Sequence, residues 1–344
     1  MEKEFDVNMI IDTKLDNYDV EFHNVESEPF RIYGMWRDGD RFYRIPMSVA
    51  EATNEGVARK AATTAGGRVR FVTDSSFIAV KAEYQQTTRV DVTPITATLG
   101  FDVYADGKYA ATYRVPQDTE TELVGVREIG DMGERVITVN LPTHSSLKKL
   151  YVGVAKGATL KRAPDYKYEK PVVFYGSSIV NGSCASRPGM IYENQISRML
   201  DTNYHNLGFG GAAKGEPAIA EYISGLDMSV FVLDYDHNAP TPEYLEETHE
   251  PFFKTVRAKN PDLPIVMISR PSGFKAEDTL KRFEIIKRTY ENAVAAGDKN
   301  VYLINGLEFF GELANECTVD GIHPTDFGFY MMSKRISQVL APLI

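Results

Sequence analysis

Residues 171–179 read Pro-Val-Val-Phe-Tyr-Gly-Ser-Ser-Ile. The four apolar residues at 172–175 show no polar alternation, which is typical of a strand buried on both faces of a parallel sheet. A glycine and two serines follow at once, and small polar residues of this kind favour a tight turn into a helix. This stretch therefore predicts the first strand of a parallel sheet, joined by a short turn to a helix.

The same pattern continues to the C-terminus. Further apolar runs lie at Tyr204–Phe209, Val230–Tyr235, Ile265–Ser269 and Val301–Ile304. Between and after them we expect helices near 190–200, 215–225, 242–258, 277–296 and 326–341. Five strands alternating with helices predict a doubly wound α/β domain with a five-stranded parallel sheet and helices on both faces. Such sheets carry their sites at the carboxyl ends of the strands.

The preceding part of the chain has a different pattern. Arg68–Thr73 alternates polar and apolar residues, the run 136–141 places three apolar residues on one face, and Asp106-Gly107 is typical of a two-residue hairpin turn. We see no helical period of useful length between 28 and 160. This part therefore predicts an all-β, jelly-roll-like sandwich over residues 1–165, and the polar stretch 161–171 predicts a linker to the α/β domain at 171–344.

Composition excludes several classes of protein. The chain has 344 residues and a formal net charge of −10, which argues against binding to nucleic acid or to an anionic membrane surface. No run is apolar for long enough to span a membrane. The N-terminus lacks a signal-peptide pattern, so we expect a cytoplasmic protein, or a secreted or periplasmic one if a leader has been removed. The sequence leaves open whether the protein forms a homo-oligomer.

Four short segments lie where strand ends are expected: Gly176-Ser177-Ser178, Gly208-Phe209-Gly210-Gly211, Asp236-His237-Asn238 and Asp320-Gly321-Ile322-His323. A serine at a strand-to-helix turn can project its hydroxyl from the sheet, although alone it is more typical of a helix cap. Among six histidines only His323 combines a strand-end position with an acid three residues earlier, which could orient its ring. A glycine N–H and an asparagine amide can both stabilise an oxyanion.

The order Ser, Gly, Asn and Asp-x-x-His, at the ends of strands one, two, three and five, resembles the SGNH/GDSL hydrolases, which are named for this quartet. The resemblance covers Pro171–Ile344. In the β-rich part, Gly100-Phe101-Asp102-Val103-Tyr104 looks like the Gly-x-Asp-Leu-Tyr signature of the domain preceding one bacterial SGNH subgroup. Arg187-Pro188-Gly189-Met190 is similar to a segment that follows the nucleophile in that subgroup.

The resemblance implies a flavodoxin-like catalytic domain and a serine esterase. Ser178 would be the nucleophile, His323 the base and Asp320 its orienter, while Gly211 and Asn238 would form the oxyanion hole with the Ser178 N–H. No metal or other cofactor is implied. The implied substrate is a short acyl ester, acetyl above all, on a carbohydrate. Ser177 replaces the family's usual Asp, and 236–239 departs from Gly-x-Asn-Asp, but neither change removes a catalytic group.

Three further residues are candidates for substrate contacts. Arg187 and His237 lie close in sequence to the catalytic segments, and Trp36 is the only tryptophan. Trp36 is one of four aromatic residues that could stack on a sugar ring, the others being Tyr33, Phe42 and Tyr43. Ordinary sandwich-core packing predicts a structural position for at least three of these four.

Three alternatives remain at this point. Residues 208–213 satisfy the G-x-G-x-x-G/A pattern of a dinucleotide-binding oxidoreductase, with Asp234 at a fitting distance, but this pattern opens the second strand–helix unit rather than the first. A lipase or acylhydrolase acting on other small esters is the second, and a non-catalytic carbohydrate-binding protein is the third. Cys184 and Cys317 lie six residues from Ser178 and His323, and they are either two buried thiols or a disulfide.

Overall fold

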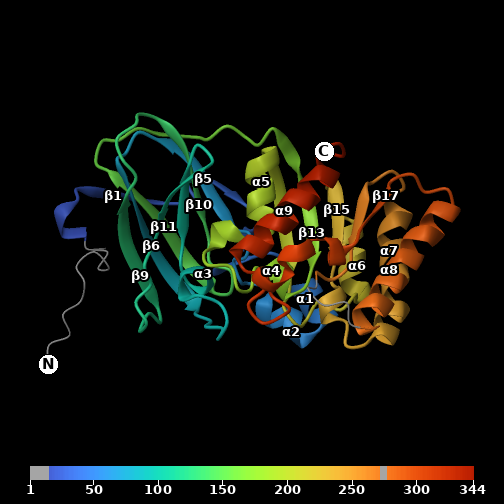
Figure 1. Ribbon diagram of the computed structural model, residues 1–344. Helices are drawn as coiled ribbons and strands as arrows, with labels where there is room; N and C mark the ends of the chain where they lie inside the picture. Colours follow the sequence, from blue (N-terminus) through green and yellow to red (C-terminus); the bar gives the residue numbers. More distant parts are fainter. Residues whose placement is uncertain (1–14, 272–276) are drawn as a thin grey trace, which may run out of the picture.

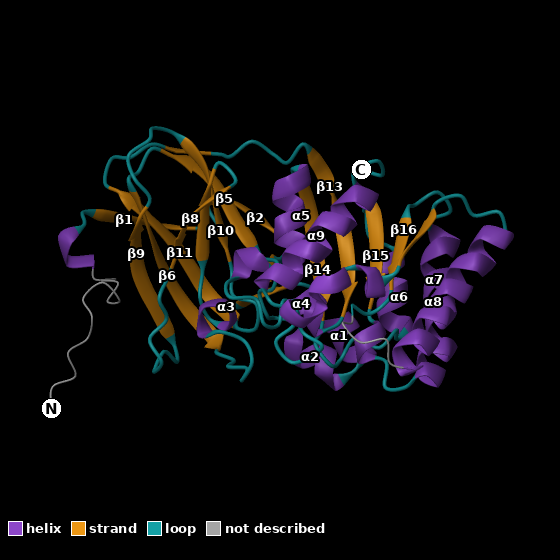
Figure 2. Ribbon diagram, viewed as in Figure 1, coloured by secondary structure: helices purple, strands orange, loops and turns teal. Residues whose placement is uncertain are grey.

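The computed structural model describes residues 15–271 and 277–344. It contains a β-rich part, left in Figures 1 and 2, and an α/β part, right in the same view. Within the described residues, no helix is long and apolar enough to cross a lipid bilayer.

The α/β part contains the five-stranded parallel sheet that the sequence predicts. The strands are β13 (Tyr168–Gly176), β14 (Thr202–Gly208), β15 (Val230–Asp234), β16 (Ile265–Ile268) and β17 (Val301–Ile304). Their order is β14-β13-β15-β16-β17, and every pair is parallel. From β13 the chain first adds β14 on one side and then adds β15, β16 and β17 on the other side. Such sheets form their sites at the point where the chain switches sides.

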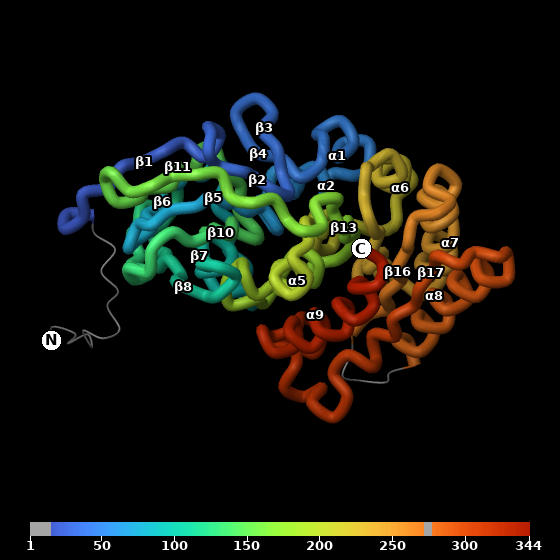
Figure 3. The backbone as a smooth tube through the Cα atoms, turned by 90° about the horizontal axis from the view of Figure 1, so that it is seen from above, coloured from blue at the N-terminus to red at the C-terminus, as the bar shows by residue number. Residues whose placement is uncertain are grey.

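Helices cover both faces of this sheet. They are α4 (Ser178–Asn181), α5 (Tyr192–Leu200), α6 (Pro217–Ser224), α7 (Pro242–Lys259), α8 (Glu277–Ala295) and α9 (Asp326–Leu340). Seen from above, α5 and α9 lie on one side of the strands and α6, α7 and α8 on the other (Figure 3). Each side has its own buried apolar cluster. The α/β fold class and the predicted long helices are confirmed.

The β-rich part is a sandwich of two sheets. One has the order β1-β11-β6-β9 and the other β12-β5-β10-β7-β8, with β2 paired to β5. The strands are β1 (Val20–Asn24), β2 (Arg31–Tyr33), β5 (Arg68–Thr73), β6 (Phe77–Gln86), β7 (Asp102–Ala105), β8 (Lys108–Thr112), β9 (Glu122–Glu128), β10 (Arg135–Asn140), β11 (Ser146–Ala155) and β12 (Leu160–Lys161). Asp106 and Gly107 join β7 to β8 with positive φ at both residues, as the hairpin prediction requires.

Two local expectations were wrong. The β-rich part includes three short helices, α1 (Met47–Thr53), α2 (Glu55–Lys60) and α3 (Ile95–Thr98). At four to seven residues they are too short to show a helical period, and α1 and α2 are held instead by Ala50 and Val57, which lie in an apolar cluster of the α/β part. In addition, β13 begins at Tyr168, inside the predicted linker, because Tyr168 pairs with Thr202 of β14.

A buried arginine connects the two parts. Arg44 follows the hairpin of β3 (Trp36–Asp38) and β4 (Arg41–Tyr43), and it is fully buried. Its Nη1 donates to the backbone oxygens of Asn206 and Gly208 and to the Asn206 side chain, at 3.0–3.1 Å. Burial lowers the pKa of Arg44 to about 9, although Glu193 opposes that shift. The N-terminal part thus fixes the carboxyl end of β14.

Candidate active site

Ser178 lies in the turn between β13 and α4. Gly176 ends the strand, and a Cβ there would approach the carbonyl oxygen of Asp234 to 2.1 Å, so no side chain fits. The side chain of Ser177 then caps α4 by accepting the N–H of Ile179 at 3.1 Å. Ser178 becomes the first helical residue, one of the positions whose N–H has no partner within the helix. The turn presents the Ser178 hydroxyl at the carboxyl edge of the sheet.

The structure brings Ser178, His323 and Asp320 into one chain of hydrogen bonds. Ser178 Oγ lies 2.8 Å from His323 Nε2, although 145 residues separate the two. On the other side of the ring, His323 Nδ1 lies 2.7 Å from Asp320 Oδ2. The carboxylate therefore favours a proton on Nδ1, and Nε2 is left to accept the serine proton.

The loop that carries His323 is fixed by its own backbone. Thr318 and Pro324 form a short antiparallel bridge that closes it. Inside the loop, Asp320 Oδ1 accepts the N–H groups of Ile322 and His323 at 3.0 and 2.8 Å. Burial alone would raise the pKa of Asp320, but these hydrogen bonds, together with the one to the His323 ring, lower it to about 2. Asp320 is therefore ionised at any pH at which the protein would work.

Gly211 and Asn238, the expected oxyanion donors, lie against each other. Gly211 N–H donates to Asn238 Oδ1 at 2.9 Å, and Asn238 Nδ2 donates to the carbonyl oxygen of Phe209 at 3.0 Å. Gly210 packs directly on the serine, since a Cβ there would lie 3.1 Å from Ser178 Cβ. One N–H of the Asn238 amide thus has no partner among the described residues, whereas the N–H of Gly211 is engaged by Asn238.

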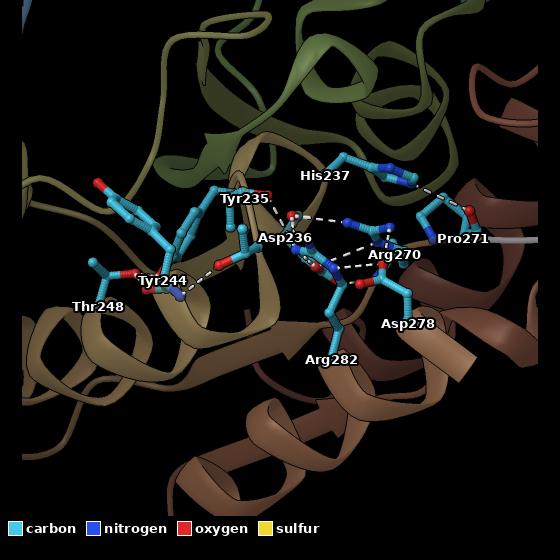
Figure 4. A network of polar contacts seen from close by, with 11 residues as sticks. Tyr235, Asp236, His237, Tyr244, Thr248, Arg270, Pro271, Asp278 and Arg282 are labelled. Carbon is cyan, nitrogen blue, oxygen red and sulfur yellow. Dashed lines mark hydrogen bonds and ion pairs between the residues drawn. The ribbon is translucent and has the colours of Figure 1, made fainter. Parts of the chain in front are cut away.

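A buried ion network holds the turn that contains Asn238. Asp236 begins this turn and is 1% exposed. Its Oδ2 accepts the backbone N–H of Arg270 at 2.8 Å, and its Oδ1 lies 3.3 Å from Arg282 Nη1. Asp278 bridges the same two arginines from α8 (Figure 4). In the sequence, only Asp236 stands next to the expected site. Nothing in the sequence pattern indicates that Arg270 and Arg282 pair with it.

His237 lies beside this network and points away from it toward Pro271 (Figure 4). Its Nε2 is 3.3 Å from the Pro271 carbonyl oxygen. Burial, with a smaller contribution from Arg270, lowers the pKa of His237 to about 3, so the ring is neutral at pH 7. Substrate contact by His237 stays a prediction.

The side chain of Arg187 makes hydrogen bonds inside the protein, between its two parts. Its Nη1 donates to Asp102 Oδ2 at 2.9 Å and to the Tyr104 hydroxyl at 2.6 Å. Asp102 Oδ2 also accepts the N–H of Gly189 at 2.8 Å. The signature at 100–104 therefore binds the segment at 187–190, so the two motifs that the sequence analysis noted separately form one contact between the parts. A role for Arg187 in binding substrate is untested.

The four aromatic candidates occupy different places. Phe42 alone belongs to the sandwich core, so the expectation of three was wrong. Tyr43 packs against the α/β core, and Tyr33 is buried on the sheet of β5. Trp36 packs edge-on against His205 in the middle of β14, with ring centroids 6.2 Å apart. This contact explains Trp36 as part of the junction, and its proposed sugar contact remains untested.

Two cavities are lined by residues close in sequence to the candidate site, although not by Ser178, Asp320 or His323, and the sequence analysis missed their lining. One, of about 460 Å³, is bordered by Gly211 and Lys214. The other, of about 150 Å³, is bordered by Asn181 and His144. Arg59 of α2 lines both, so the short helix of the N-terminal part lies between them. No sequence signal connects α2 with residues more than 100 positions away.

His144 was not among the candidates of the sequence analysis. Its Nε2 lies 3.1 Å from Ser183 Oγ, just after α4, and its Nδ1 lies 2.7 Å from Thr143 Oγ1. Burial lowers the pKa of His144 to about 3, with Arg44, Lys60 and the nearby His323 acting in the same direction. A second neutral histidine, besides His237, thus lies near His323.

Cys184 and Cys317 are both free and buried, so a disulfide is not formed. Burial raises the pKa of Cys184 to about 11, and the charge of Asp320 adds to the effect. Cys317 lies in the core beside α9. Across the part of the chain that is described, no group of three or more His, Cys, Asp or Glu side chains could hold a metal ion.

The glycine-rich segment after β14 serves the serine turn. A Cβ on Gly208 would lie 2.3 Å from the backbone N of Asn181, so this glycine permits close packing of α4. No helix follows until Pro217, whereas a dinucleotide-binding fingerprint opens a helix directly. Asp234 is buried and accepts the Tyr192 hydroxyl at 3.1 Å. These positions do not fit a dinucleotide site.

Comparisons with known proteins agree with this geometry. Residues 169–341, half of the chain, match the family described as GDSL-like lipase/acylhydrolase. Residues 20–160 match the domain described as the N-terminus of esterases of the SGNH-hydrolase type, named GxDLY. None of the curated proteins matches the chain.

Among solved structures, a putative GDSL-like lipase from Bacteroides ovatus is similar over 94% of this chain and 98% of its own, with 29% identity and a TM-score of 0.84. The salicylyl-acyltransferase SsfX3 from a tetracycline biosynthetic pathway covers 95% and 98%, with 21% identity and a TM-score of 0.76. An acetyl xylan esterase, Est2A, from the rumen bacterium Butyrivibrio proteoclasticus covers 94% and 98%, with 14% identity and a TM-score of 0.59. The chain therefore belongs to the GDSL-like lipase/acylhydrolase family of SGNH hydrolases and is a carboxylic ester hydrolase.

Proposed function

We propose that the protein is a serine esterase that removes short acyl groups, acetyl above all, from carbohydrate. The observation that carries the proposal is the hydrogen-bond chain from Ser178 Oγ through the His323 ring to Asp320, with distances of 2.8 and 2.7 Å. Nucleophile, base and orienter in this order are the geometry of acyl transfer through a covalent intermediate.

In the proposed reaction, His323 Nε2 takes the proton of Ser178 while Oγ attacks the ester carbonyl. The tetrahedral intermediate collapses, His323 returns the proton to the leaving sugar hydroxyl, and an acyl-enzyme remains. Water then attacks the acyl-enzyme, with His323 again accepting its proton and passing it to Ser178. Asp320 stays ionised throughout, because its pKa is about 2, and stabilises the imidazolium.

The oxyanion would be held by the Ser178 N–H and by the N–H of Asn238 that has no partner in the described residues. Gly211 can contribute only if the oxyanion replaces Asn238 Oδ1 as the acceptor of its N–H. The Asn238 amide is well placed for this exchange, because the Asp236 network fixes the turn that carries it. Losing one such donor typically lowers the rate by about 10²–10³.

The polar lining of the two cavities at Asn181 and at Gly211 supports a small and polar substrate. Arg59, Lys60, His144 and Lys214 line them, and such side chains suit sugar hydroxyls better than a long acyl chain. Similar folds occur in an acetyl xylan esterase and in carbohydrate esterases of family two. These likenesses support the choice of an acetylated sugar over a lipid ester.

The proposal is tested by hydrolysis of p-nitrophenyl acetate, butyrate and octanoate by the wild type and by Ser178→Ala. We expect kcat/KM to fall as the chain lengthens and activity to vanish in the variant. Ser177→Ala is the matched control, since it removes the neighbouring hydroxyl that caps α4 but not the nucleophile, and it should retain most activity. Activity that survives in Ser178→Ala would mean that another residue is the nucleophile.

The same assay separates the alternatives. Faster turnover of octanoate than of acetate would favour a lipase or an acylhydrolase of other esters. A wild type that is inactive on all three esters and on acetylated xylo-oligosaccharides, but binds the oligosaccharides, would favour a non-catalytic carbohydrate-binding protein. Acetate release from the oligosaccharides, measured directly, is the result expected here.

A further inference from the structure

A second cavity lies at the other end of the parallel sheet. Its volume is about 360 Å³, and it lies between the sheet of β5 and β10 and the C-terminal end of α5. Ser197, Arg198 and Asp201 line it from α5 and the residue after it, just before β14 begins. Because Ser178 lies at the carboxyl ends of the strands, this cavity at their amino ends is separate from the catalytic site, and the inference drawn from it does not depend on the proposed function.

Cross-strand pairing places polar side chains on the wall of this cavity. In the antiparallel pair of β5 and β10, Arg68 is opposite Asn140 and Arg70 is opposite Thr138. Residues two apart on a strand point to the same face, so these four side chains share one face. All four line the cavity. This face of the sandwich is thus polar and cationic, although it is covered by α5.

The guanidinium of Arg70 is buried without a polar partner. Arg70 is 8% exposed, its Nη1 is buried, and its side chain makes no hydrogen bond or ion pair with the described residues. Arg68 and Arg198 also have no carboxylate within ion-pair distance among those residues; they donate to uncharged oxygens, such as those of Tyr204 and Gly189. Buried cations are normally paired, so unpaired ones indicate a missing anion.

Two of these guanidinium groups lie over the faces of aromatic rings. Arg70 lies 4.0 Å above the ring centre of Tyr166, and Arg198 lies 4.1 Å above that of Tyr104. A guanidinium that stacks by its face keeps the N–H groups at its edge for in-plane acceptors. A planar carboxylate is the acceptor that fits this edge best, because it can accept two parallel N–H groups.

The cavity also contains an acceptor without a donor. Asn140 is 1% exposed, and its Nδ2 donates to Asp102 at 2.8 Å, but its Oδ1 is buried without a partner. This oxygen needs an O–H or N–H group. Three aspartates also line the cavity, but they are exposed at its rim, and Asp106 and Asp165 are already hydrogen-bonded to Val136 and Tyr33.

We propose that this cavity binds an acidic monosaccharide, a hexuronate, through its carboxylate and a hydroxyl. The carboxylate accepts from Arg70 and Arg198, and a sugar hydroxyl donates to Asn140 Oδ1. The volume is far larger than an inorganic anion needs and accommodates a single sugar ring. The site would attach the esterase to a uronate-containing glycan away from its catalytic serine.

The test is calorimetric titration of the full chain with D-glucuronate, D-glucose and inorganic phosphate at equal ionic strength. Glucuronate should bind at least about tenfold more tightly than glucose, because the carboxylate supplies charge-assisted hydrogen bonds. Arg70→Gln should weaken glucuronate binding by about tenfold or more and leave hydrolysis of p-nitrophenyl acetate unchanged. That unchanged activity separates this site from the catalytic one.

Arg31→Gln is the matched control. Arg31 is the register partner of Arg70 on β2, but it is paired with Asp165 and Glu169 and does not line the cavity. Equal losses in both variants would overturn the site, and phosphate binding without glucuronate binding would overturn the sugar acid. No binding of any of the three compounds would mean that water alone fills the cavity. If Arg70→Gln does not fold, Arg198→Gln gives the same measurement.

Discussion

The two ends of the parallel sheet each contain a pair of largely buried arginines, and the pairs differ in their partners. At the carboxyl end, Arg270 and Arg282 surround the carboxylate of Asp236. At the amino end, Arg68 and Arg70 face a cavity and have no carboxylate within ion-pair distance among the described residues. The residue type is the same and burial is similar, with Arg270 the most exposed at 15% of its side chain, so the main difference lies in whether the protein itself supplies the anion.

This difference indicates what each group does. An ion pair that the protein completes fixes local structure, and here it fixes the turn that carries Asn238. A cation that the protein leaves incomplete lowers stability unless a ligand completes it. The catalytic end is therefore built to be rigid without substrate, and the amino end is built to respond to an anion.

The largest effect is expected from Asp320→Asn at the catalytic end. The amide oxygen can still accept the backbone N–H groups of the loop, but the amide nitrogen would then face His323 Nδ1. The ring would adopt the other tautomer, with its proton on Nε2, and could not accept the proton of Ser178. We expect kcat for p-nitrophenyl acetate to fall by about 10³–10⁴ with little change in KM.

Glu316→Gln is the control for this change, since Glu316 is an exposed acid just before the same loop. Its activity should stay within about twofold of the wild type. A loss of less than tenfold in Asp320→Asn would show that the short contact to His323 does not set the tautomer.

The next largest effect is expected on stability, from Asp236→Asn. Removing one partner of a buried ion pair leaves the other charge uncompensated, at a cost of about 3–5 kcal/mol. Asp278 pairs with the same two arginines but is half-exposed. We therefore expect Asp278→Asn to lower the free energy of unfolding by less than about 1 kcal/mol. Urea unfolding of both variants measures the difference. Equal costs would show that burial of Asp236 is not what matters.

The sequence predicted the five strands at the catalytic end, and the structure brings together the residues it singled out after them, although their catalytic roles stay predictions. Ser178 follows β13 directly, whereas His323 lies 19 residues after the end of β17, so the sequence predicted only that both lie beyond the carboxyl ends of the strands. Asp320 is only three residues from His323, so the two side chains stay close together whatever conformation the loop adopts. The five strands and five long helices were predicted for the same reason, because each is a long and regular pattern.

The amino end and the junction could not be predicted. Arg70 occupies a polar position of an alternating strand, a pattern typical of a solvent-facing side chain, and only the position of α5 shows that it is buried. Arg44 and Arg59 come from the N-terminal part, more than 100 residues before Asn206 and Gly211, and His144 precedes Ser183 by 39 residues. Trp36 was chosen because it is the only tryptophan, which says nothing about where it packs.

The pH dependence of stability tests the burial of a histidine next to Tyr235. Burial lowers the pKa of His249, which stacks on Tyr235, to about 4, although Asp236 and Glu250 oppose the shift. Between pH 6.5 and pH 4 the unfolded chain binds a proton at this histidine that the folded protein does not. Stability is therefore lost on acidification through this window, by up to about 1.4 kcal/mol per pH unit. In His249→Gln the unfolding free energy should fall less steeply, and parallel slopes would contradict the shift.

The smallest effect is expected from Arg70→Met, measured without ligand. Methionine keeps the length and removes a charge that no protein group pairs, so the free energy of unfolding should stay within about 1 kcal/mol of the wild type or rise. The stack on Tyr166 opposes this, since a desolvated cation–π contact is worth about 2 kcal/mol. A loss of about 2 kcal/mol in unfolding free energy would mean that the Tyr166 ring compensates the charge of Arg70. The two ends of the sheet would then differ only in whether a ring or a carboxylate compensates the arginines. No loss, together with weaker glucuronate binding, would mean that Arg70 is kept for a ligand and not for the fold.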